Sequence, residues 1–393
     1  MRQSRRTVLG IEKLCESRRG LIGGARVGLV CNQASVDHEL THSADLLKNA
    51  QGVRLTTLFG PQHGIRGDVQ DNMVETAHAF DSETGLPVYS LYSETREPTE
   101  RMLEEVDVIV CDLQDVGCRI YTFVYTIANC MRAARKLGKR VVVCDRPNPI
   151  GGVSVEGNVL VEGFESFVGQ FPVPTRHGMT ACELSRMFNE HWGIGCELEV
   201  VTMDGWSRDL WFEETGAPWV IPSPNMPTPD TTKVFPGTVH VEGTQLSEGR
   251  GTTRPFELVG APYVEAHELA RRLESYGLPG VHFRPTGFMP TFQKHAGRAC
   301  GGVQIHVRER EEFRPVLTGV AVVKSCRDLY GEEFRWKEPP YEYVYDKNPF
   351  DVISGTDSLR EAIERGDSLE AIEESWKEGR LTFEAARADY LLY

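Results

Sequence analysis

The segment VDVIVCDLQDVGCRIYTFVYTIANCMRAARKLGKRVVVCDRP (106–147) decides the fold, because it holds a strand, a loop, a helix and a second strand in succession. Its two ends are short Val/Ile/Cys runs bounded by charged residues, a pattern typical of buried strands. Between them, residues 121–138 place apolar side chains at helical spacing and stop at a glycine. This order of elements predicts a parallel sheet that helices cover on both faces.

The same alternation continues on both sides of this segment. Apolar runs typical of strands occur at residues 25–32, 53–60 and 196–203, and helical patterns occur at 38–49 and 180–193. We therefore expect an α/β protein whose N-terminal domain is built on a Rossmann-like parallel sheet.

The composition changes after residue 220. Residues 221–238 contain five prolines and no helical period, which predicts an ordered crossing or a linker. A second, smaller α/β unit follows, because a chain of 393 residues suits two domains. We place the two domains at residues 1–235 and 236–393. In the second, we expect helices at 261–277 and 313–331, strands at 281–288 and 301–307, and a helical tail at 356–393 with Gly366 and Gly379 as stops.

Net charge limits the possible partners. The chain carries a net charge of −14, so neither nucleic acid nor an anionic membrane surface is an expected partner. No stretch approaches the roughly 18 apolar residues of a membrane span. We expect a small-molecule substrate, and a negatively charged one would need a local cluster of arginines.

The ten cysteines are scattered along the chain, and none forms the CxxC pair that holds zinc or exchanges disulfides. Cys111 and Cys144 lie in apolar strand-like runs, and Cys130 lies on the apolar face of a helix. Free, buried thiols are typical of a reducing compartment. We therefore expect a cytoplasmic protein.

Polar loops follow three of the predicted strands, namely GPQHGIRGD (60–68), DLQDVGCRIYTF (112–123) and DRPNPIGG (145–152). Ligands of open parallel sheets bind beyond the carboxyl ends of the strands, so we expect a site here. An Asp at a strand end can also be a simple helix cap. The second half adds VPTRHGMT (173–180) and EGTQLSEGRGTTRPFE (242–257), the latter either a salt-bridged surface loop or a glycine-rich seat for an anionic ligand.

Standard cofactor motifs are absent or incomplete. No GxGxxG follows the first strand and no Walker A lysine loop occurs, so a nucleotide is not expected. The stretch from His38 to His42 matches HExxH, in which two histidines on one helix face ligate zinc. However, it lies where polar residues cap a predicted helix, and no third ligand follows at a familiar spacing. We expect no metal and no cofactor, with a zinc hydrolase as the alternative.

Taken together, these loops resemble those of the exo-acting β-N-acetylmuramidases of bacterial peptidoglycan turnover, a family long known only as a domain of unknown function. The resemblance implies a Rossmann-like catalytic domain and a smaller C-terminal α/β domain, with the substrate in the cleft between them. It implies hydrolysis of a terminal, non-reducing β-1,4-linked N-acetylmuramic acid in peptidoglycan fragments. The matching segments are RVGLVCNQASVD, LFGPQHGIRGD, TGLPVYSLY, DLQDVGCRIYTF, DRPNPIGG, PVPTRHGMT, PSPNMPT, FPGTVHVEGTQLSEGRGTTRPFELVGAP and CGGVQIHV.

Hydrolysis of a glycoside needs two carboxyl groups that flank the bond, ~5–5.5 Å apart for retention or ~6.5–9.5 Å for inversion. Many members of the family carry Glu in a PEHG motif, whereas this chain has Gln62, which cannot exchange a proton. We therefore expect Gln62 to hold a substrate hydroxyl or amide. The following DVQDNMVE offers Asp68, Asp71 and Glu75. We take Glu75 as the general acid and Asp115 as its partner.

Asp112 is the alternative partner, although a residue so close to its strand can also anchor the loop. Other polar residues of the same loops are expected to bind the substrate. The lactyl carboxylate of muramic acid is a natural ligand for an arginine fork, so the set includes four arginines for that role, Arg119, Arg176, Arg250 and Arg254. For each single residue, a cap, a loop brace or a buried ion pair is the structural alternative. The expected binding residues are Gln62, His63, Arg66, Arg119, Tyr121, Asp145, Arg146, Asn148, Arg176, His177, Glu242, Glu248, Arg250 and Arg254.

Two other functions remain open at this point. Gln62 is compatible with a related glycosidase that acts on a different sugar. It is also compatible with a sugar- or muropeptide-binding protein that kept the cleft and lost the acid.

Overall fold

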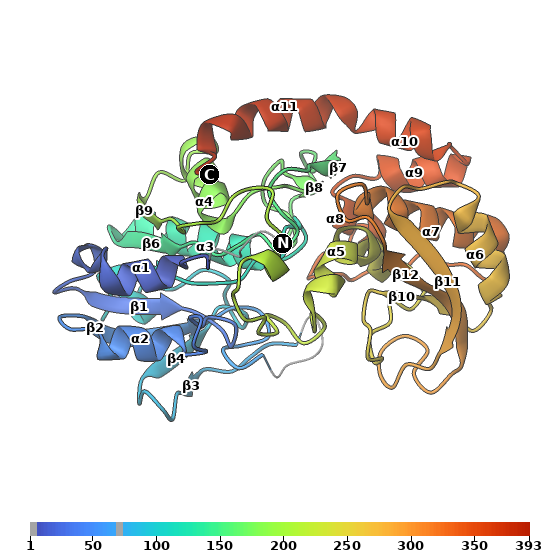
Figure 1. Cartoon of the computed structure of the whole chain (residues 1–393). Helices are drawn as coiled ribbons and strands as arrows, with labels where there is room; N and C mark the ends of the chain where they lie inside the picture. The colour runs from blue at the N-terminus through green and yellow to red at the C-terminus, as the bar shows by residue number, and fades with distance from the viewer. Residues whose placement is uncertain (1–5, 68–73) are drawn as a thin grey trace.

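The structure, a computed structural model, describes residues 6–67 and 74–393. In its N-terminal part, a seven-stranded sheet forms the central layer (Figure 1). From edge to edge, the strands are β3 (Ala79–Phe80), β4 (Pro87–Ser90), β2 (Arg54–Gly60), β1 (Arg26–Val30), β5 (Val108–Cys111), β6 (Arg140–Cys144) and β9 (Glu197–Val201). All neighbouring strands are parallel except β3 and β4. Without the edge strand β3, this is the strand order of a Rossmann fold, as predicted.

Helices cover both faces of this sheet. They are α1 (Gly10–Glu16), α2 (Ser43–Asn49), α3 (Phe123–Leu137) and α4 (Ala181–Glu190). Because side chains of a strand alternate between its faces, Val108 belongs to the buried cluster of α1 and α2, and Ile109 to that of α3 and α4. Burial on both faces explains why the strands are continuous apolar runs in the sequence.

The helix that we predicted from residue 38 begins only at Ser43. Before it, Asp37 accepts hydrogen bonds from the backbone amides of Glu39 and Thr41, at 2.9 and 2.8 Å, and so closes a tight turn. His42 then caps the helix, because its Nδ1 accepts from the amide of Ala44 at 3.2 Å. The HExxH match therefore lies in a turn rather than on a helix.

The proline-rich stretch is irregular at residues 221–228 but forms a helix after them, so our prediction of an ordered crossing or a linker without helix was wrong from residue 229 onward. This helix, α5 (Pro229–Thr238), begins at a proline, continues past Pro236 and leads into the 3₁₀ turn η4 (Val239–Gly243). It packs closely on α7 (Pro315–Leu329) through Gly237. A Cβ atom on Gly237 would lie 1.8 Å from the carbonyl oxygen of Pro315, which only glycine avoids. Tertiary packing thus outweighs the weak helical propensity of this segment.

The C-terminal part is a smaller α/β unit, as predicted. Its sheet is antiparallel, in the order β10 (Leu258–Ala261), β12 (Cys300–Val307) and β11 (Val281–Phe288). The helix α6 (Ala266–Glu274) packs against this sheet, and α7 packs on α6. The strand β10 was not predicted, because the helical pattern that we began at residue 261 starts later. Short 3₁₀ turns elsewhere in the described chain are η1 (Arg19–Leu21), η2 (Arg101–Leu103), η3 (Phe212–Glu214) and η5 (Ala388–Tyr390).

The tail forms a row of helices that returns to the N-terminal part (Figure 1). These are α8 (Pro349–Ser354), α9 (Ser358–Arg365), α10 (Leu369–Ser375) and α11 (Lys377–Arg387). Gly366 ends α9 in a left-handed conformation, as predicted. Gly379 is not a stop: α11 runs through it and packs there on the two-stranded ribbon of β7 (Glu156–Val159) and β8 (Pro174–Arg176), which needs the space that a glycine leaves.

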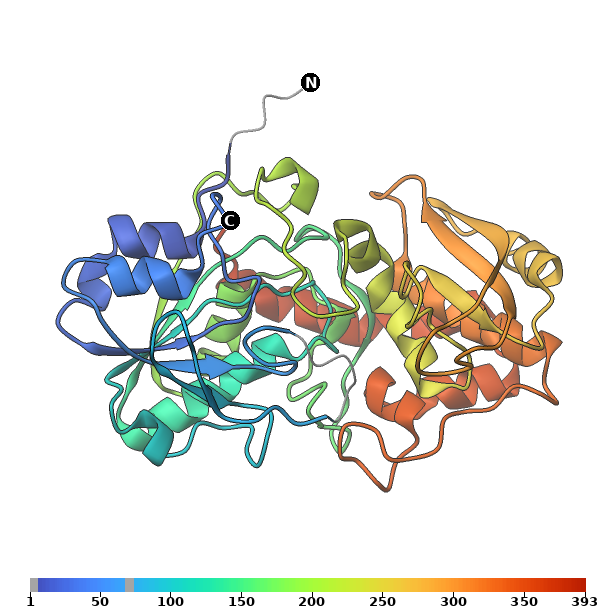
Figure 2. The same ribbon diagram turned by 90° about the horizontal axis from the view of Figure 1, so that it is seen from below.

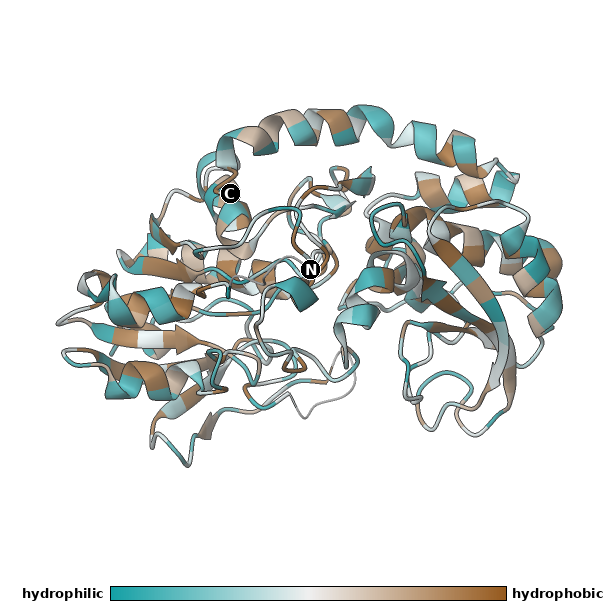
Figure 3. Ribbon diagram, viewed as in Figure 1, coloured by the Kyte–Doolittle hydropathy of each residue, from teal (hydrophilic) through white to brown (hydrophobic). Residues whose placement is uncertain are grey.

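The two parts lie side by side and share one buried apolar cluster, and the C-terminus lies on the N-terminal part (Figure 2). Polar and apolar residues alternate along α11, which has one face on the protein (Figure 3). The predicted division at residue 235 falls within α5 and stays a prediction. In the described part of the chain, no helix combines the length and apolarity that crossing a membrane requires.

Candidate active site

A cavity lies where the loops after β2 and β5 meet η4 and a late segment around residue 342. It measures about 50 Å³, or about 510 Å³ if the solvent at its mouth is counted. The loops after β2 and β5 follow the carboxyl ends of parallel strands, where open α/β sheets bind ligands. The polar lining comprises Gln62, His63, Tyr121, Thr122, Ser223, Asn225, Glu242, Arg250, Tyr341 and Glu342.

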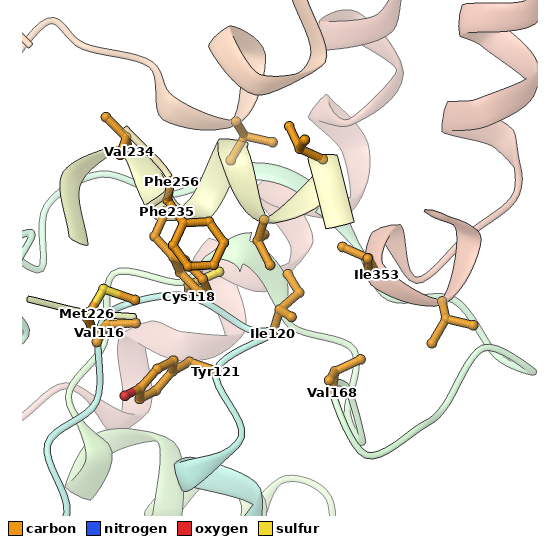
Figure 4. Close-up of a cluster of buried hydrophobic side chains, with 14 of the residues drawn as sticks. Val116, Cys118, Ile120, Tyr121, Val168, Met226, Val234, Phe235, Phe256 and Ile353 are labelled. Carbon is orange, nitrogen blue, oxygen red and sulfur yellow. The ribbon is translucent and has the colours of Figure 1, made fainter. Parts of the chain in front are cut away.

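One wall of the cavity is apolar. Several of its side chains belong to the buried apolar cluster that Figure 4 shows. Phe235 of α5 meets Phe256 edge to face, with ring centroids 4.8 Å apart, and Tyr121 meets Phe235 at 6.0 Å. Val168 and Met226 extend this wall. An apolar wall opposite polar groups suits a sugar, whose ring has apolar faces and a polar edge.

The loop after β2 brings Gln62 and His63 to the cavity. His63 has a φ of 70° and the following Gly64 a φ of 77°, so the chain turns sharply here in the left-handed region. Gln62 is 6% exposed. Its Oε1 accepts a hydrogen bond from the Thr122 hydroxyl at 2.8 Å, and its Nε2 donates to Oε1 of Glu342 at 3.3 Å. The amide is thus held by partners within the chain.

Glu242 is the first of two carboxyl groups in the lining. Arg250 donates to its Oε1 at 2.5 Å, and the hydroxyl of Tyr341 donates to its Oε2 at 2.8 Å. Burial alone would raise the pKa of Glu242, but Arg250 and Tyr341 together hold that pKa below its usual value. Glu248 approaches Arg250 from behind, with Oε1 3.3 Å from Nε. Glu242 is therefore an ionised carboxylate in a buried charge network.

Glu342 is the second carboxyl group of the cavity, and it is 3% exposed. The hydroxyl of Tyr92 donates to its Oε2 at 2.8 Å. Burial raises the pKa of Glu342, and the nearby charge of Glu242 acts in the same direction, whereas Tyr92 and Gln62 oppose the shift. The environments of the two carboxyl groups thus push their pKa values apart, the pattern that separates a proton donor from an ionised carboxylate in enzymes.

Asp112 and Arg146 lie outside the cavity lining and form a buried ion pair. Nε and Nη2 of Arg146 donate to the two carboxylate oxygens of Asp112, at 2.6 and 2.7 Å. The hydroxyl of Ser43 also donates to Asp112, and Arg146 donates to the carbonyl of Val36 at 2.9 Å. The pair braces the loops at the ends of β1, β5 and β6.

Asp115, His177 and Asn148 form a second buried group beside these loops. Asp115 accepts from the amide of Gly117 at 2.7 Å, and its Oδ2 lies 3.3 Å from Nε2 of His177. Asn148 donates to the carbonyl of Met179 at 2.9 Å. Within the described residues, Oδ1 of Asp115 has no hydrogen-bond partner. These three side chains do not line the cavity.

Asp145 is fully buried and bonded within the protein. Its carboxylate accepts from the Thr180 hydroxyl at 2.7 Å, from the Cys182 amide at 3.0 Å and from the hydroxyl of the C-terminal Tyr393 at 2.7 Å. Burial raises the pKa of Asp145 to about 7. Its contacts tie the tail to the end of β6, away from the cavity.

Of the four arginines predicted for a substrate carboxylate, only Arg250 lines the cavity, and two carboxylates already flank it. Arg119 is buried and donates to the carbonyls of residues 353 and 354, at 3.2 and 2.8 Å. Arg176 donates to the carbonyl of Ile150 at 2.7 Å and borders another hollow. Arg254 pairs with Glu257 at 3.2 Å.

Glu75 and Arg66 line a neighbouring hollow of about 450 Å³ formed by the loop after β2 and by β3 and β4. Both side chains are exposed, and Nη2 of Arg66 lies 3.9 Å from Oδ1 of Asp81. Asp68 and Asp71, the other acids of this loop, lie outside the described residues. The proposed acid Glu75 and its partner Asp115 are therefore not brought together in one cavity.

The two histidines of the HExxH match have partners of other kinds. Nδ1 of His38 lies 3.1 Å from the carboxylate of Glu12, and Nε2 of His42 lies 2.9 Å from the carbonyl oxygen of Asn32. Across residues 6–67 and 74–393, no three His, Cys, Asp or Glu side chains are grouped to hold a metal ion.

Five polar residues of the lining were not predicted from the sequence, namely Glu342, Tyr341, Thr122, Ser223 and Asn225. The first two lie in YEYVY (341–345), where an acid stands between aromatic residues with no motif around it. Thr122 lies inside the quoted 112–123 loop but was passed over as an uncharged residue. An acid flanked by tyrosines soon after two prolines is a weak signal, and the cavity alone reveals its place.

The fold and the cavity define the class of this molecule: a two-part α/β protein with a paired-carboxylate site at the junction. Sequence models of the family described as "Exo-beta-N-acetylmuramidase NamZ" match residues 27–230 with the N-terminal part and 233–393 with the C-terminal part. The peptidoglycan β-N-acetylmuramidase NamZ of Bacillus subtilis (strain 168) is 45% identical over 384 residues, which cover 98% of this chain and 91% of that protein. The chain belongs to the NamZ family.

Solved structures agree with this assignment. The crystal structure of a DUF1343 family protein from Bacteroides fragilis NCTC 9343 matches with a TM-score of 0.89 and 37% identity over 99% of both chains. A second DUF1343 family protein from the same organism matches with a TM-score of 0.77 and 24% identity, also over 99% of both chains, and supports the fold.

Proposed function

We propose that the protein is an exo-acting β-N-acetylmuramidase, a glycoside hydrolase that releases terminal, non-reducing β-1,4-linked N-acetylmuramic acid from peptidoglycan fragments. The observation that carries this proposal is the 45% identity to the B. subtilis enzyme over nearly the whole chain. That match spans every element that lines the cavity. Two carboxyl groups, Glu242 and Glu342, line this cavity, and paired carboxyl groups are what glycoside hydrolysis requires.

Within this proposal, the polar lining holds the sugar. Gln62, His63, Tyr121, Glu242 and Arg250 are the predicted binding residues that border the cavity. The buried side chains of the other predicted residues brace the strand-end loops that carry this lining. A catalytic pair of Glu75 and Asp115 stays a prediction that the cavity does not support.

Hydrolysis of a chromogenic β-N-acetylmuramide tests the proposal, run beside the matching β-N-acetylglucosaminide and with and without a chelator. Release from the muramide alone, unchanged by the chelator, is the expected result. Release from neither substrate would contradict the proposal for this chain. Inhibition by the chelator together with stoichiometric metal in the purified protein would favour the zinc hydrolase instead.

Gln62 favours a second candidate, because an amide cannot exchange a proton as a carboxyl group does. The protein would then be a related glycosidase with a different sugar, or a sugar-binding protein without turnover. A panel of chromogenic hexosaminides distinguishes the first case from the proposal. Calorimetric binding of N-acetylmuramic acid without any release from the panel would identify the second.

We also propose a cytoplasmic location. All ten cysteines are free, and nine of them are buried, which suits a reducing compartment. Fractionation of the source cells with antibody detection tests this location. Recovery outside the cytoplasm would contradict it.

A further inference from the structure

We propose that Glu342 is the acid that protonates the leaving oxygen in this reaction, and that Gln62 is a positioning residue that holds Glu342. This inference rests on the proposed function and deepens it, because it names the proton donor in a chain that lacks the PEHG glutamate. It replaces the exposed Glu75 with a residue that lines the cavity.

The first support is the way in which Glu342 is held. Tyr92 donates to one carboxyl oxygen at 2.8 Å and Gln62 to the other at 3.3 Å. Thr122 fixes the amide of Gln62 in turn, because its hydroxyl donates to the amide oxygen at 2.8 Å. Three side chains of the N-terminal part thus orient the carboxyl group of Glu342, which belongs to the C-terminal part. Tyr92 and Gln62 bond it directly, and Thr122 acts through Gln62. Such orientation within hydrogen-bonding reach is what proton transfer requires.

The second support is a strained turn that presents Glu342. The backbones of Tyr341 and Val344 exchange hydrogen bonds of 3.1 and 2.9 Å, so Glu342 and Tyr343 are the two central residues of a tight turn. Both have positive φ, 46° and 66°, a conformation that normally selects Asn-Gly. Neither glutamate nor tyrosine favours a positive φ by itself. Backbone strain of this kind is retained where a function depends on the side chain that it places.

The third support is the charge around Glu342. The titratable and polar groups around it are Tyr92, Gln62, Tyr341, Glu242 and, at longer range, Arg96. Burial and Glu242 raise the pKa of Glu342, so its carboxyl group keeps its proton to a higher pH than an exposed glutamate does. Glu242 keeps its charge through Arg250 and Tyr341. One cavity therefore contains a proton donor and an anion, and the anion would favour the positive charge that develops at the sugar carbon.

Hydrolysis of the glycosidic bond by this acid needs no reactant other than the substrate and one water molecule. The bond between C1 of the muramic acid and the leaving oxygen breaks, and the carboxyl proton of Glu342 passes to that oxygen. Water supplies the hydroxide that bonds to C1, and the remaining proton of that water restores the acid. One water is consumed, and two hydroxyl groups form.

Kinetics of Glu342→Gln on two leaving groups test the inference. On the disaccharide of N-acetylmuramic acid and N-acetylglucosamine, whose alkoxide needs a proton to leave, kcat/KM should fall by about 10²- to 10⁴-fold. On the 2,4-dinitrophenyl muramide, whose phenolate leaves without a proton, the loss should be far smaller. The matched control is Glu338→Gln, the same change at an exposed residue of the same segment, which should leave both rates unchanged.

The alternatives give different results. Equal losses on both substrates would assign Glu342 a structural role and overturn the inference, as would full activity of the variant on the disaccharide. If Glu75→Gln, and not Glu342→Gln, lost activity on the disaccharide but kept it on the dinitrophenyl muramide, Glu75 would be the acid. If the wild-type protein hydrolysed neither substrate, the proposed function would be contradicted, and so would the inference that rests on it.

The positioning role of Gln62 needs a readout other than rate. Gln62→Met keeps a side chain of similar length but removes the donor to Glu342. Because a donor to the carboxylate lowers the pKa, its loss should move the basic limb of the kcat/KM profile to higher pH. A lower rate with an unmoved limb would reduce Gln62 to a packing role.

A separate observation concerns Arg96, and from it we infer a receptor for the lactyl carboxylate of the substrate. Its guanidinium lies 4.0 Å from the ring centroid of Tyr92 and 4.9 Å from that of Tyr343, so it is stacked beside Glu342. It is half-buried, and its Nη1 donates a hydrogen bond to the carbonyl of Ser93, but among the described residues no carboxylate lies within ion-pair distance of it. A half-buried guanidinium without a carboxylate partner, fixed by aromatic rings, is suited to bind an anion from the substrate.

Arg96→Gln, compared with Arg101→Gln at an exposed site, tests this receptor on two substrates. One is the chromogenic muramide, and the other is the same molecule with its lactyl group as the methyl amide. The variant should lose about 10- to 100-fold in kcat/KM on the acid and little on the amide, because a charged hydrogen bond contributes about 1.5–3 kcal/mol. Equal losses on both, or none on either, would overturn the inference.

Discussion

Gln62 and Glu342 are 280 residues apart in the chain, yet Nε2 of the amide donates to Oε1 of the carboxyl at 3.3 Å. This bond joins the loop after β2 to a turn of the C-terminal part across the cavity. A glutamate at position 62 would place two carboxyl groups in contact here. This chain has instead an amide that can only orient the second.

Gln62→Glu would create that carboxyl pair, and we expect it to change the pH dependence of turnover. Two carboxyl groups in contact cannot both ionise readily, so the pair should retain a proton to higher pH than Glu342 alone. The basic limb of kcat/KM should move up by about one pH unit or more. A pH–rate profile of both proteins measures this, and a limb that stays in place would contradict the pairing.

Asp112→Asn should reduce stability rather than catalysis. It removes one partner of the buried ion pair with Arg146, which costs about 3–5 kcal/mol in comparable cases. Asp107→Asn, which breaks the more exposed pair with Arg26, should cost about 1 kcal/mol or less. Denaturant unfolding gives both values. A large loss of turnover with unchanged stability would instead indicate that Asp112 is the second catalytic carboxyl group.

Asp145 should make the protein less stable as the pH rises. Its pKa is about 7 in the folded state against roughly 3.9 when unfolded, so between these values the folded state binds more protons. The stabilisation is complete below the unfolded pKa and is lost as the pH passes through the folded one. Between pH 5 and pH 8, the fall in Tm should be larger for the wild type than for Asp145→Asn, and equal falls would contradict this.

Gly237→Ala should destabilise the contact between α5 and α7. Alanine favours a helix by about 1 kcal/mol over glycine, but the new Cβ would meet a carbonyl oxygen at 1.8 Å. Overpacking against backbone should dominate and cost about 3 kcal/mol. Gly287→Ala, where the nearest atom would be 3.7 Å away, is the control and should be nearly neutral. Equal stability of the two variants would refute the close packing.

Local pattern was enough to predict the sheet, because strands buried on both faces must be apolar throughout their length. It failed at α5, where the prolines of 221–238 conceal a helix that packing on α7 stabilises. It also failed at Gly379, since only the contact with β7 explains a glycine inside α11. Propensity describes a segment alone, whereas these elements depend on their neighbours.

Local pattern also predicted only part of the cavity lining, and the predicted roles of these residues stay predictions. Strand-end loops located Gln62 and His63, because the carboxyl ends of parallel strands converge in space. Glu342 comes from a distant turn that no local motif marks. Conversely, Asp112 and Asp145 looked available for a ligand, but their acceptors are satisfied inside the protein. A sequence shows which polar residues are present, and only the fold shows which of them already have partners.

Exo-cleavage and sugar preference can be measured together on two chains of alternating sugars, one with N-acetylmuramic acid and one with N-acetylglucosamine at the non-reducing end. Mass spectrometry of the products over time follows each reaction. The account predicts that free N-acetylmuramic acid appears from the first chain from the earliest time point, while the second stays intact. Internal fragments, or release of N-acetylglucosamine from the second chain, would contradict an exo-acting muramidase.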